Sequence, residues 1–474
     1  MPYLRCYNKT GTLVEIDNDA DPASLPNEAV TINIENGRLM FGRGFNYETL
    51  ARLIRSAPKT LDKITITDEP SVLTPAYLVF LAATFSKTDC LVLDSCICHP
   101  AEIGCLVAGL TQPDGIRELQ LLLPMTIFPN HLFLMIIQAV SFSSSLEKLD
   151  FRATNVMTED NLGELLIEAL GTNLSLKTLT LQLDWGDPNQ SHLEQAFHAV
   201  VLNNRINDLS LECSLFSAYH QSLDQEVLMD VLCRQECTIE KLRLADIELE
   251  GEAGTLQVTD DANNIPKNTS LKDLTILLGR LDCSQATAIV RRFTSLHSVN
   301  LGGNNLQSIS MFNDLLVSNQ LQSLVVYNNG VDEAEMKTFL LQLPTTRSLQ
   351  NLELGSCLFP TGVSKSCVGL LEDCLSRNTS LERLKIDYET EDEEWAEYYD
   401  DTFSIPLSLN RAGRQYLQDD AGVQLPAKLW PLILQRAGKI SYYCVFDDAW
   451  KHPTMTSTRV DVVYWLLRER ILIS

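Results

Sequence analysis

The fold is decided by a hexapeptide that recurs along the middle of the chain. Residues 146–151 read Leu-Glu-Lys-Leu-Asp-Phe, residues 176–181 read Leu-Lys-Thr-Leu-Thr-Leu, and residues 206–211 read Ile-Asn-Asp-Leu-Ser-Leu. Each copy begins 30 residues after the previous one. Because successive side chains of a strand point to opposite faces, the last two apolar residues of each copy share one face. The pattern therefore predicts a row of equivalent strands.

The same pattern, Leu-x-x-Leu-x-Leu with Ile, Val or Phe as substitutes, extends in both directions. Copies begin at Leu61, Thr88, Ile116, Leu146, Leu176, Ile206, Ile239, Leu271, Leu296, Leu321, Leu349 and Leu381, with a degenerate copy at Ala29. The mean separation is about 29 residues, a period typical of repeat proteins.

Between the strand signals, the apolar residues follow a helical period. One face of a helix over residues 158–173 would carry Leu162, Leu165, Leu166, Ala169 and Leu170. The same spacing is repeated by Cys367, Leu370, Leu371, Cys374 and Leu375. Each unit is thus predicted to be one strand and one helix, and only stacked neighbours can bury both apolar faces. We expect an α/β solenoid of about 12–13 repeats over residues 29–390.

Asparagine and cysteine recur where such a repeat must turn. The eighth residue after the first Leu is Asn304, Asn329, Cys357 or Cys96 in four copies, and the repeat favours Asn or Cys there because the chain turns inward. Asn268 and Asn378 stand three residues before a copy, and we expect each to end a helix in the left-handed conformation. That role explains two Asn-x-Ser/Thr sequons without glycosylation.

These units resemble the leucine-rich repeat of the ribonuclease-inhibitor type, which is also that of Ran GTPase-activating proteins. The resemblance covers about three quarters of the chain. It implies a horseshoe with parallel strands on the concave side and helices on the convex side. It is a stronger argument for architecture than for function, since one scaffold serves many partners.

The two ends differ from the repeats. Residues 1–28 are rich in turn formers and are expected to form an irregular N-terminal lead-in or cap, while residues 391–474 are expected to form an acidic linker and a C-terminal cap. The tail resembles the C-terminal segment of many leucine-rich-repeat proteins of diatoms and related algae, through Asn410–Arg414, Leu429-Trp430-Pro431 and Leu466-Leu467-Arg468. That resemblance implies no particular chemistry.

The acidic and aromatic stretch 388–401 has two interpretations. It contains eight acids in fourteen positions, with Trp395, Tyr398 and Tyr399 among them. A solvated linker is the simpler interpretation, because runs of charge are usually hydrated. The alternative is a docking segment for a basic partner, with Trp395 and Tyr398 as anchors.

Composition limits the class of protein. Among 474 residues, 62 acids face 37 bases, for a formal charge of −25, and such a surface repels nucleic acid. No apolar run reaches the roughly 18 residues of a membrane span, and the N-terminus lacks an apolar signal core. The 13 cysteines form no disulfide framework, which indicates a reducing compartment. We expect a cytoplasmic protein without nucleic-acid or membrane partners.

The sequence carries no recognisable catalytic or metal constellation. Cys90, Cys96, Cys98, His99 and Cys105 cluster within sixteen residues, but their spacing matches no paired zinc knuckle, so structural thiols are the preferred interpretation over zinc. Cys233 and Cys237 are interpreted in the same way. A phosphate-binding loop, a His-Glu-x-x-His pair and a Gly-x-Ser-x-Gly elbow are all missing from the sequence. We therefore expect no enzymatic activity, cofactor or small-molecule substrate.

The strand residues between the anchor leucines are the candidate binding residues, because they would line the concave face. They are Lys148, Asp150, Arg152, Thr178, Thr180, Gln182, Asp208, Ser210, Glu212, Lys241, Arg243, Ser323, Val325, Tyr327, Asn351, Glu353, Arg383 and Lys385. The preferred contacts are Tyr327, Glu353, Arg383, Lys385, Lys241, Arg243, Asp150 and Arg152, with Tyr327, Arg383 and Lys385 as a patch.

The resulting hypothesis is a non-enzymatic scaffold that binds a protein partner through the concave face. Two alternatives stay open. One is an activator or other regulator of a small GTPase, which the resemblance to Ran activators suggests. The other is a substrate-recognition subunit of a ubiquitin ligase, although residues 1–28 are too short for the adaptor-binding helical module that role usually needs.

Overall fold

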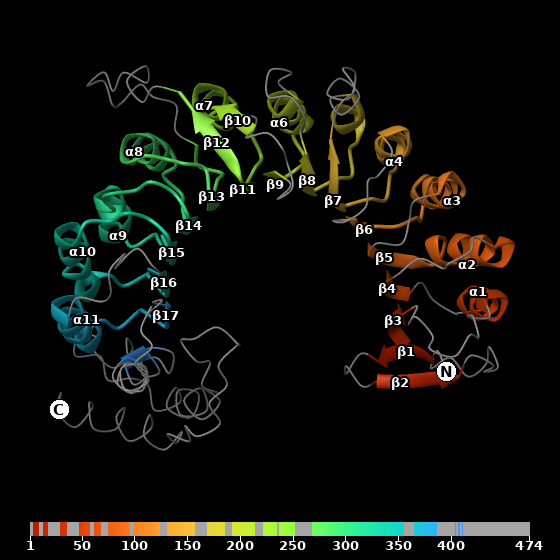
Figure 1. The fold of residues 1–474 in the computed structure, drawn as a ribbon, viewed down its shortest axis with the longest axis horizontal. Coiled ribbons are helices and arrows are strands. Elements are labelled where there is room, and N and C mark those ends of the chain that lie inside the picture. The colour runs from red at the N-terminus through yellow and green to blue at the C-terminus, as the bar shows by residue number, and fades with distance from the viewer. Residues whose placement is uncertain are drawn as a thin grey trace. The chain divides into compact units, whose positions relative to one another are not determined.

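A computed structural model describes most of the repeat region. The residues it describes are 3–8, 13–17, 29–35, 47–56, 61–67, 74–94, 99–123, 130–156, 168–184, 192–213, 221–234, 237–251, 268–354 and 365–385, with Phe403, Pro406, Leu407 and Asn410. They belong to two compact units, Met1–Gly251 and Glu252–Ser474. Each unit is a parallel sheet alternating with helices, an α/β architecture consistent with a leucine-rich-repeat-like solenoid (Figure 1).

In the first unit the parallel strands follow the chain order. They are β3 (Ala29–Glu35), β4 (Leu61–Thr67), β5 (Thr88–Asp94), β6 (Glu118–Leu123), β7 (Lys148–Val156), β8 (Thr178–Asp184), β9 (Asp208–Cys213) and β11 (Lys241–Ala245). The helices between them are α1 (Tyr47–Ser56), α2 (Pro75–Phe85), α3 (Pro100–Leu110), α4 (Asn130–Phe142), α6 (His192–Asn203) and α7 (Gln225–Leu232).

The strand register confirms the repeat read from the sequence. Leu149 of β7 is the partner of Leu119 on β6 and of Leu179 on β8, and Leu179 is in turn the partner of Leu209 on β9. The four leucines are fully buried. Equivalent residues of successive repeats therefore stack in rows across the sheet. Such stacking lets each repeat bury its apolar residues against its neighbours.

The helices cover one face of this sheet, as Figure 1 shows for α1 to α4 and α6. The core between the two layers holds large aromatic side chains, among them the fully buried Tyr77, Phe80, Phe151 and Phe197. The rings of Phe133 and Phe151 lie 4.8 Å apart between their centroids, which ties α4 to β7. Among the described residues, no helix covers the opposite face of the sheet, and we call it the open face.

The N-terminal segment is more regular than its turn formers suggest. Strand β1 (Tyr3–Asn8) pairs antiparallel with both β2 (Leu13–Asp17) and β3. Apolar and acidic residues alternate in β2, with Val14 and Ile16 on either side of Glu15, and this alternation is a strand signal that the turn formers obscure. The sheet thus begins with two antiparallel strands before the parallel series starts.

A second, small sheet accompanies α7. Strands β10 (Gln221–Asp224) and β12 (Ile247–Glu250) pair in parallel, and Asp224 then caps α7 by accepting a hydrogen bond from the backbone N–H of Glu226. The sequence pattern did not predict this pair, because four-residue strands are too short to show a period.

The second unit has a shorter version of the same plan. Its parallel strands are β13 (Asp273–Leu277), β14 (Ser298–Asn300), β15 (Ser323–Val325), β16 (Asn351–Glu353) and β17 (Arg383–Lys385). Its helices are α8 (Cys283–Arg292), α9 (Asn313–Val317), α10 (Glu333–Leu340) and α11 (Lys365–Arg377), with short 3-10 turns η3 (Ser310–Phe312) and η4 (Leu343–Thr345).

The predicted helical faces are present where the structure describes them. On α11, Cys367, Leu371, Cys374 and Leu375 are buried as expected, while the fifth residue of that face, Leu370, is half-buried. In the other predicted helix, residues 168–172 are helical and bury Ala169 and Leu170, whereas the rest of that prediction lies outside the described residues.

The expected left-handed conformation of Asn268 and Asn378 is wrong. Among the described residues, positive φ angles at asparagine occur at Asn204, Asn319 and Asn328 instead. Asn378 is fully buried; its amide donates to the Leu343 carbonyl of the preceding repeat at 2.6 Å, and its Oδ1 accepts from the backbone of Ser380 and Leu381. The asparagine thus stabilises the turn through hydrogen bonds of its side chain, without a left-handed backbone.

The same asparagine recurs at the helix-to-strand turn of other repeats. Asn173, Asn203, Asn268 and Asn378 are all buried, so the sequons at Asn173, Asn268 and Asn378 are inaccessible in the folded chain. Asn410 is buried as well, and its amide donates to Leu381 at 2.8 Å. The first residue of the Asn410–Arg414 element is therefore one further rung of this asparagine series.

The turn after the strand confirms the other asparagine prediction. Asn304 donates to the carbonyls of Ile276 and Leu301 at 2.9 Å each and accepts from the backbone of Gly279 and Leu281 at 3.1 Å. Asn329 makes the equivalent bonds one repeat later. Cys96 and Cys357, predicted for the same position, lie outside the described residues.

Candidate binding surface

The open face of the first unit carries three rows of side chains, because alternate strand residues point away from the helices. The first row is Lys63, Cys90, Glu118, Lys148, Thr178, Asp208 and Lys241. The second row is Thr65, Val92, Gln120, Asp150, Thr180, Ser210 and Arg243. The third row is Thr67, Asp94, Leu122, Arg152, Gln182, Glu212 and Ala245.

Asp150 and Arg152 form a paired group on β7. Two hydrogen bonds join them, from Arg152 Nε to Asp150 Oδ1 at 2.9 Å and from Arg152 Nη2 to Asp150 Oδ2 at 3.2 Å. The Asp150 side chain is only 12% exposed, whereas that of Arg152 is 41% exposed. Donation of these hydrogen bonds to the Asp150 carboxylate raises the pKa of the Arg152 guanidinium, and the negative charges of Asp150 and Glu212 raise it further. This parallel, two-bond geometry holds the guanidinium in one orientation.

A second group lies two strands away, around Glu212 of β9. Its Oε1 accepts from Arg243 Nε at 2.8 Å and from the hydroxyl of Ser210 at 3.0 Å. The Glu212 side chain is 12% exposed and that of Arg243 is 43% exposed. In both groups the carboxylate is therefore sheltered and the guanidinium faces solvent.

Asp246 lies beside the second group and has an unusual backbone. Its φ is 56°, a left-handed value that Asp tolerates better than most residues. Burial raises the pKa of its carboxyl, the charge of Glu212 raises it further, and Arg243 partly offsets both effects. We call Asp150, Arg152, Ser210, Glu212, Arg243 and Asp246 the charged cluster.

The sequence places five of these six residues on the predicted strands, and three of them, Asp150, Arg152 and Arg243, are among the preferred contacts. It missed Asp246, because a residue just past a strand has no periodic signal to mark its direction. It also could not show that the carboxylates are sheltered, since that depends on which neighbours cover them. Lys241, the fourth preferred residue of this unit, stands in the first row, beside Asp208 in register.

In the second unit, the preferred residues do not gather at one point. Lys385 of β17 contacts Glu353 of β16, with 3.0 Å between Nζ and Oε1. Arg383 is exposed and is in register with Asn351, whose amide donates to Ser323 at 2.9 Å. These contacts and the strand register place Ser323, Asn351 and Arg383 in one row, with Val325, Glu353 and Lys385 in a second row.

Tyr327 points to the preceding repeat rather than to Arg383 and Lys385. A Cβ added to Gly302 would lie 2.4 Å from Cε1 of the Tyr327 ring, so the ring packs directly on the backbone of Gly302. Gly303 supports this position because its N–H donates to the Tyr327 carbonyl at 2.8 Å. The sequence-predicted patch of Tyr327, Arg383 and Lys385 is thus a packed Tyr327–Gly302 pair followed by a separate Glu353–Lys385 ion pair.

The cysteine and histidine cluster has a structural role where it is described. Nδ1 of His99 accepts from the backbone N–H of Ala101, and the Glu102 carboxylate accepts from the N–H of His99, so the two residues cap α3. Cys105 is half-buried, and burial raises the pKa of its thiol. Among the described residues, no group of three His, Cys, Asp or Glu side chains is arranged to hold a metal ion. Cys96 and Cys98 lie outside the described residues.

None of the helices that the structure describes combines the length and apolar character needed to cross a bilayer. The acidic stretch 388–401 lies outside the described residues, so both of its interpretations stand. The chain matches no protein-family model, and it matches no curated protein either.

Proposed function

We propose that this protein is a non-enzymatic scaffold that binds a protein partner through the open face of its sheet. In this proposal the chain is a leucine-rich-repeat protein of the ribonuclease-inhibitor type, and the open face is the concave side of a horseshoe. The supporting observations are the alternation of parallel strands and helices in the part of the chain that the structure describes, the in-register leucines and the asparagine series at the turns.

The charged cluster is the observation that carries the proposal. Asp150 and Glu212 are sheltered and hold Arg152 and Arg243 through hydrogen bonds of 2.8 to 3.2 Å. A partner that meets these guanidinium groups does not have to order them, so little conformational entropy is lost on binding. Arginine is also among the residues that most often dominate binding energy. The cluster therefore presents two oriented guanidinium groups to a partner on the open face.

The structure offers a matched pair of variants to test this. Arg243 on the open face and Arg234 after α7 have nearly equal exposed fractions, 43% and 40%, and each forms an ion pair with one carboxylate. Arg243→Glu and Arg234→Glu change the net charge by the same amount. A difference between them therefore reports position on the molecule rather than charge.

The experiment uses the full tagged chain and extract from its native organism, with every captured protein quantified against the wild type. We expect at least one partner to be lost with Arg243→Glu and kept with Arg234→Glu. With that partner purified, Arg243→Glu should raise Kd at least about tenfold, equal to about 1.4 kcal/mol. Equal effects of the two variants on every captured protein would contradict an open-face binding site.

The captured partner also distinguishes the two alternative functions. A small GTPase would call for a GTP hydrolysis assay with the purified chain, in which acceleration supports a regulator and unchanged hydrolysis supports a scaffold. Co-purification of ubiquitin-ligase components would support substrate recognition for such a ligase.

A further inference from the structure

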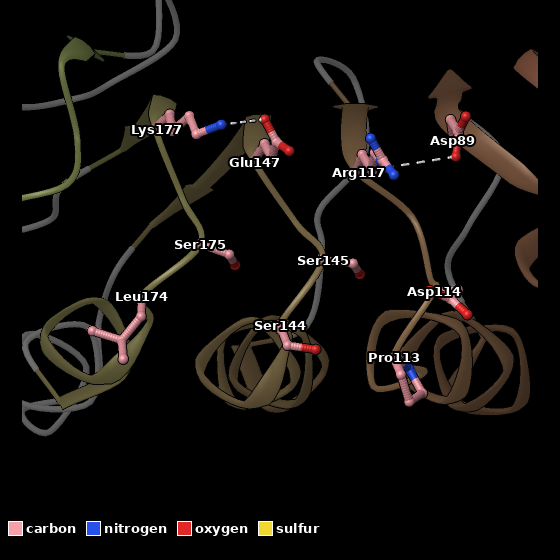
Figure 2. Close-up of a pocket in the computed structure, with 10 residues that line it drawn as sticks. All are labelled: Asp89, Pro113, Asp114, Arg117, Ser144, Ser145, Glu147, Leu174, Ser175 and Lys177. Atoms are coloured by element: carbon pink, nitrogen blue, oxygen red, sulfur yellow. Dashed lines mark hydrogen bonds and ion pairs between the residues drawn. The ribbon is translucent and has the colours of Figure 1, made fainter.

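A groove lies at the edge of the first unit, away from the charged cluster. It has a volume of about 660 Å³ and is lined by the turns that connect helices to strands in three successive repeats. Figure 2 shows its arrangement, with Lys177, Glu147, Arg117 and Asp89 along one wall and Leu174, Ser144 and Pro113 along the other. Ser145 and Ser175 lie between the two walls.

The charged wall arises from one repeat position. Asp89, Arg117, Glu147 and Lys177 are each the second residue of a strand hexapeptide, so they recur at intervals of 28, 30 and 30 residues. Their charges alternate along the edge. The Lys177–Glu147 ion pair is 2.6 Å long, and that of Arg117 and Asp89 is 3.9 Å long.

Negative charge predominates in this groove. Asp114 adds a third carboxylate against the two cations of the wall, and its side chain forms no hydrogen bond or ion pair with any residue that the structure describes. The lining turns also follow the C-terminal ends of α3, α4 and the helix over 168–172, where the helix dipole gives partial negative charge. The chain as a whole has a formal charge of −25. A cationic group is therefore favoured over an anionic one.

The opposite wall offers an apolar contact. Leu174 is 72% exposed, so a large apolar side chain is in contact with water. Covering it with an apolar group of a partner would lower the free energy. Asp114 and Leu174 belong to repeats separated by one other repeat, Ile116 to Ser145. Strand spacing of about 4.8 Å and helix spacing of about 10 Å place such turns roughly 10 to 20 Å apart. An extended peptide covers that span with about four to six residues.

We propose that this groove is a second interaction surface, which binds an extended segment of a partner protein carrying a basic and an apolar side chain about four residues apart. The basic side chain pairs with Asp114, and the apolar side chain covers Leu174. The surface lies on the edge of the sheet, so it is separate from the open face and can be occupied at the same time.

The test measures fluorescence anisotropy of labelled synthetic peptides with the full chain. The probes are Gly-Leu-Ser-Thr-Ser-Arg-Gly and its reversed sequence, together with versions in which Glu replaces Arg or Ser replaces Leu. At low salt, at least one Arg peptide should bind at least tenfold more tightly than its Glu counterpart, and the Leu→Ser peptide should bind several-fold more weakly. Affinity should fall as NaCl is raised, because the attraction is partly between exposed charges.

Two variants and two matched controls assign the site. Asp114→Arg should abolish the preference for the Arg peptide, and Leu174→Ser should remove the effect of the peptide leucine. Asp314→Arg makes the same charge change at an exposed aspartate of α9, and Leu341→Ser makes the same change at a leucine that is 57% exposed after α10. Both controls should bind like the wild type, with unchanged circular dichroism in all four variants.

The proposal is overturned if the Glu peptide binds as tightly as the Arg peptide, or if no peptide binds. It is also overturned if Asp314→Arg weakens binding as much as Asp114→Arg, which would show attraction to net charge alone. Because the probe is a synthetic peptide, these outcomes are read independently of any partner retained by the open face.

Discussion

In the first unit, strands β7, β8 and β9 contain nine, seven and six residues, whereas β14 to β17 in the second unit contain three residues each. The long strands carry a third open-face row with Arg152, Gln182 and Glu212. At the equivalent position the second unit has Gly302 and Tyr327, where the chain is already turning toward the next helix. Strand length therefore decides whether this row can present a charged cluster.

The two units also satisfy their backbone differently. Strand pairing continues over five residues from Lys148 to Arg152 between β7 and β8 and over six residues from Thr178 to Leu183 between β8 and β9. Where the three-residue strands stop, Asn304 and Asn329 supply the missing donors and acceptors from their side chains. Because a buried unpaired backbone group is costly, the short-strand unit depends on these amides.

The largest expected effect tests that dependence. Asn304→Ala removes side-chain hydrogen bonds to five buried backbone groups and should destabilise the chain by about 3 kcal/mol. The adjacent Asn305 is exposed, and its amide makes a single long contact of 3.4 Å to Arg280. Asn305→Ala should change stability by less than about 0.5 kcal/mol. Urea unfolding followed by circular dichroism measures both, and similar losses in the two variants would refute the proposed role of Asn304.

A smaller effect on stability is expected where the Tyr327 ring packs on Gly302. Gly302→Ala places a Cβ against the Tyr327 ring and should cost about 2 kcal/mol, because overpacking displaces the ring. In a Tyr327→Ala background the same change should cost less than about 0.5 kcal/mol. A double-mutant cycle by urea unfolding gives the coupling, and a cost that persists without the ring would assign it to the backbone of Gly302.

Asp282 should make the stability of the fold decrease at acid pH. Burial raises the pKa of this carboxyl, but hydrogen bonds from the Ser284 hydroxyl and the backbone of Gln285 and Ser284 outweigh that effect and lower it. A lowered pKa stabilises the fold above the unfolded value of 3.8, and this contribution is lost as the pH falls through the folded pKa. Asp282→Ala removes the cap of α8 and should cost about 1 kcal/mol at pH 7.

Measured by urea unfolding at several pH values, the difference between wild type and Asp282→Ala should shrink below pH 3.8. A difference that stays constant down to pH 2.5 would show that the charge of the cap is irrelevant.

Asp246 in the first unit should have the opposite effect on the pH dependence of stability, and this effect should be the smallest. The pKa of Asp246 is raised by burial and by Glu212, so its proton is bound more tightly in the folded chain, and stability falls as the pH rises above the unfolded value of 3.8. Asp246→Asn keeps a residue that tolerates positive φ and should stabilise the chain by about 0.5 kcal/mol at pH 7, since solvent screens much of the effect. The gain should disappear as the pH approaches 4. A gain that is independent of pH would contradict this electrostatic origin.

The sequence was sufficient for the features that repeat and insufficient for those that occur once. The leucines of residues 146–151 and 176–181 predict both strands and their register, because a period repeated a dozen times leaves one consistent stacking. Asn378 shows the limit, since the same Asn-Thr-Ser signal fits a backbone turn or a side-chain bridge, and only the position of the neighbouring carbonyls selects between them.

The candidate sites also divide into features that repeat, which the sequence predicts, and features that occur once, which it does not. Asp150, Arg152 and Arg243 could be placed on the open face by alternation alone. The Tyr327–Gly302 packing could not, because it depends on a glycine one repeat earlier. The charged wall of the groove does have a sequence signal, the alternating charges of Asp89, Arg117, Glu147 and Lys177 at one repeat position, which aligning the copies would expose.

The account depends most on the claim that open-face residues of successive repeats stand side by side. Thr180 and Ser210 are partners in the register of β8 and β9, whereas Thr180 and Asp208 are offset by two residues. Adjacent strands lie about 4.8 Å apart, within reach of a disulfide, and the offset pair is about 8 Å apart, beyond it. After mild oxidation and peptide mass spectrometry, the Thr180→Cys/Ser210→Cys chain should contain the 180–210 cross-link and the Thr180→Cys/Asp208→Cys chain should contain none. Cross-linking of the offset pair alone, or of neither pair, would contradict the repeat register from which both proposed surfaces are built.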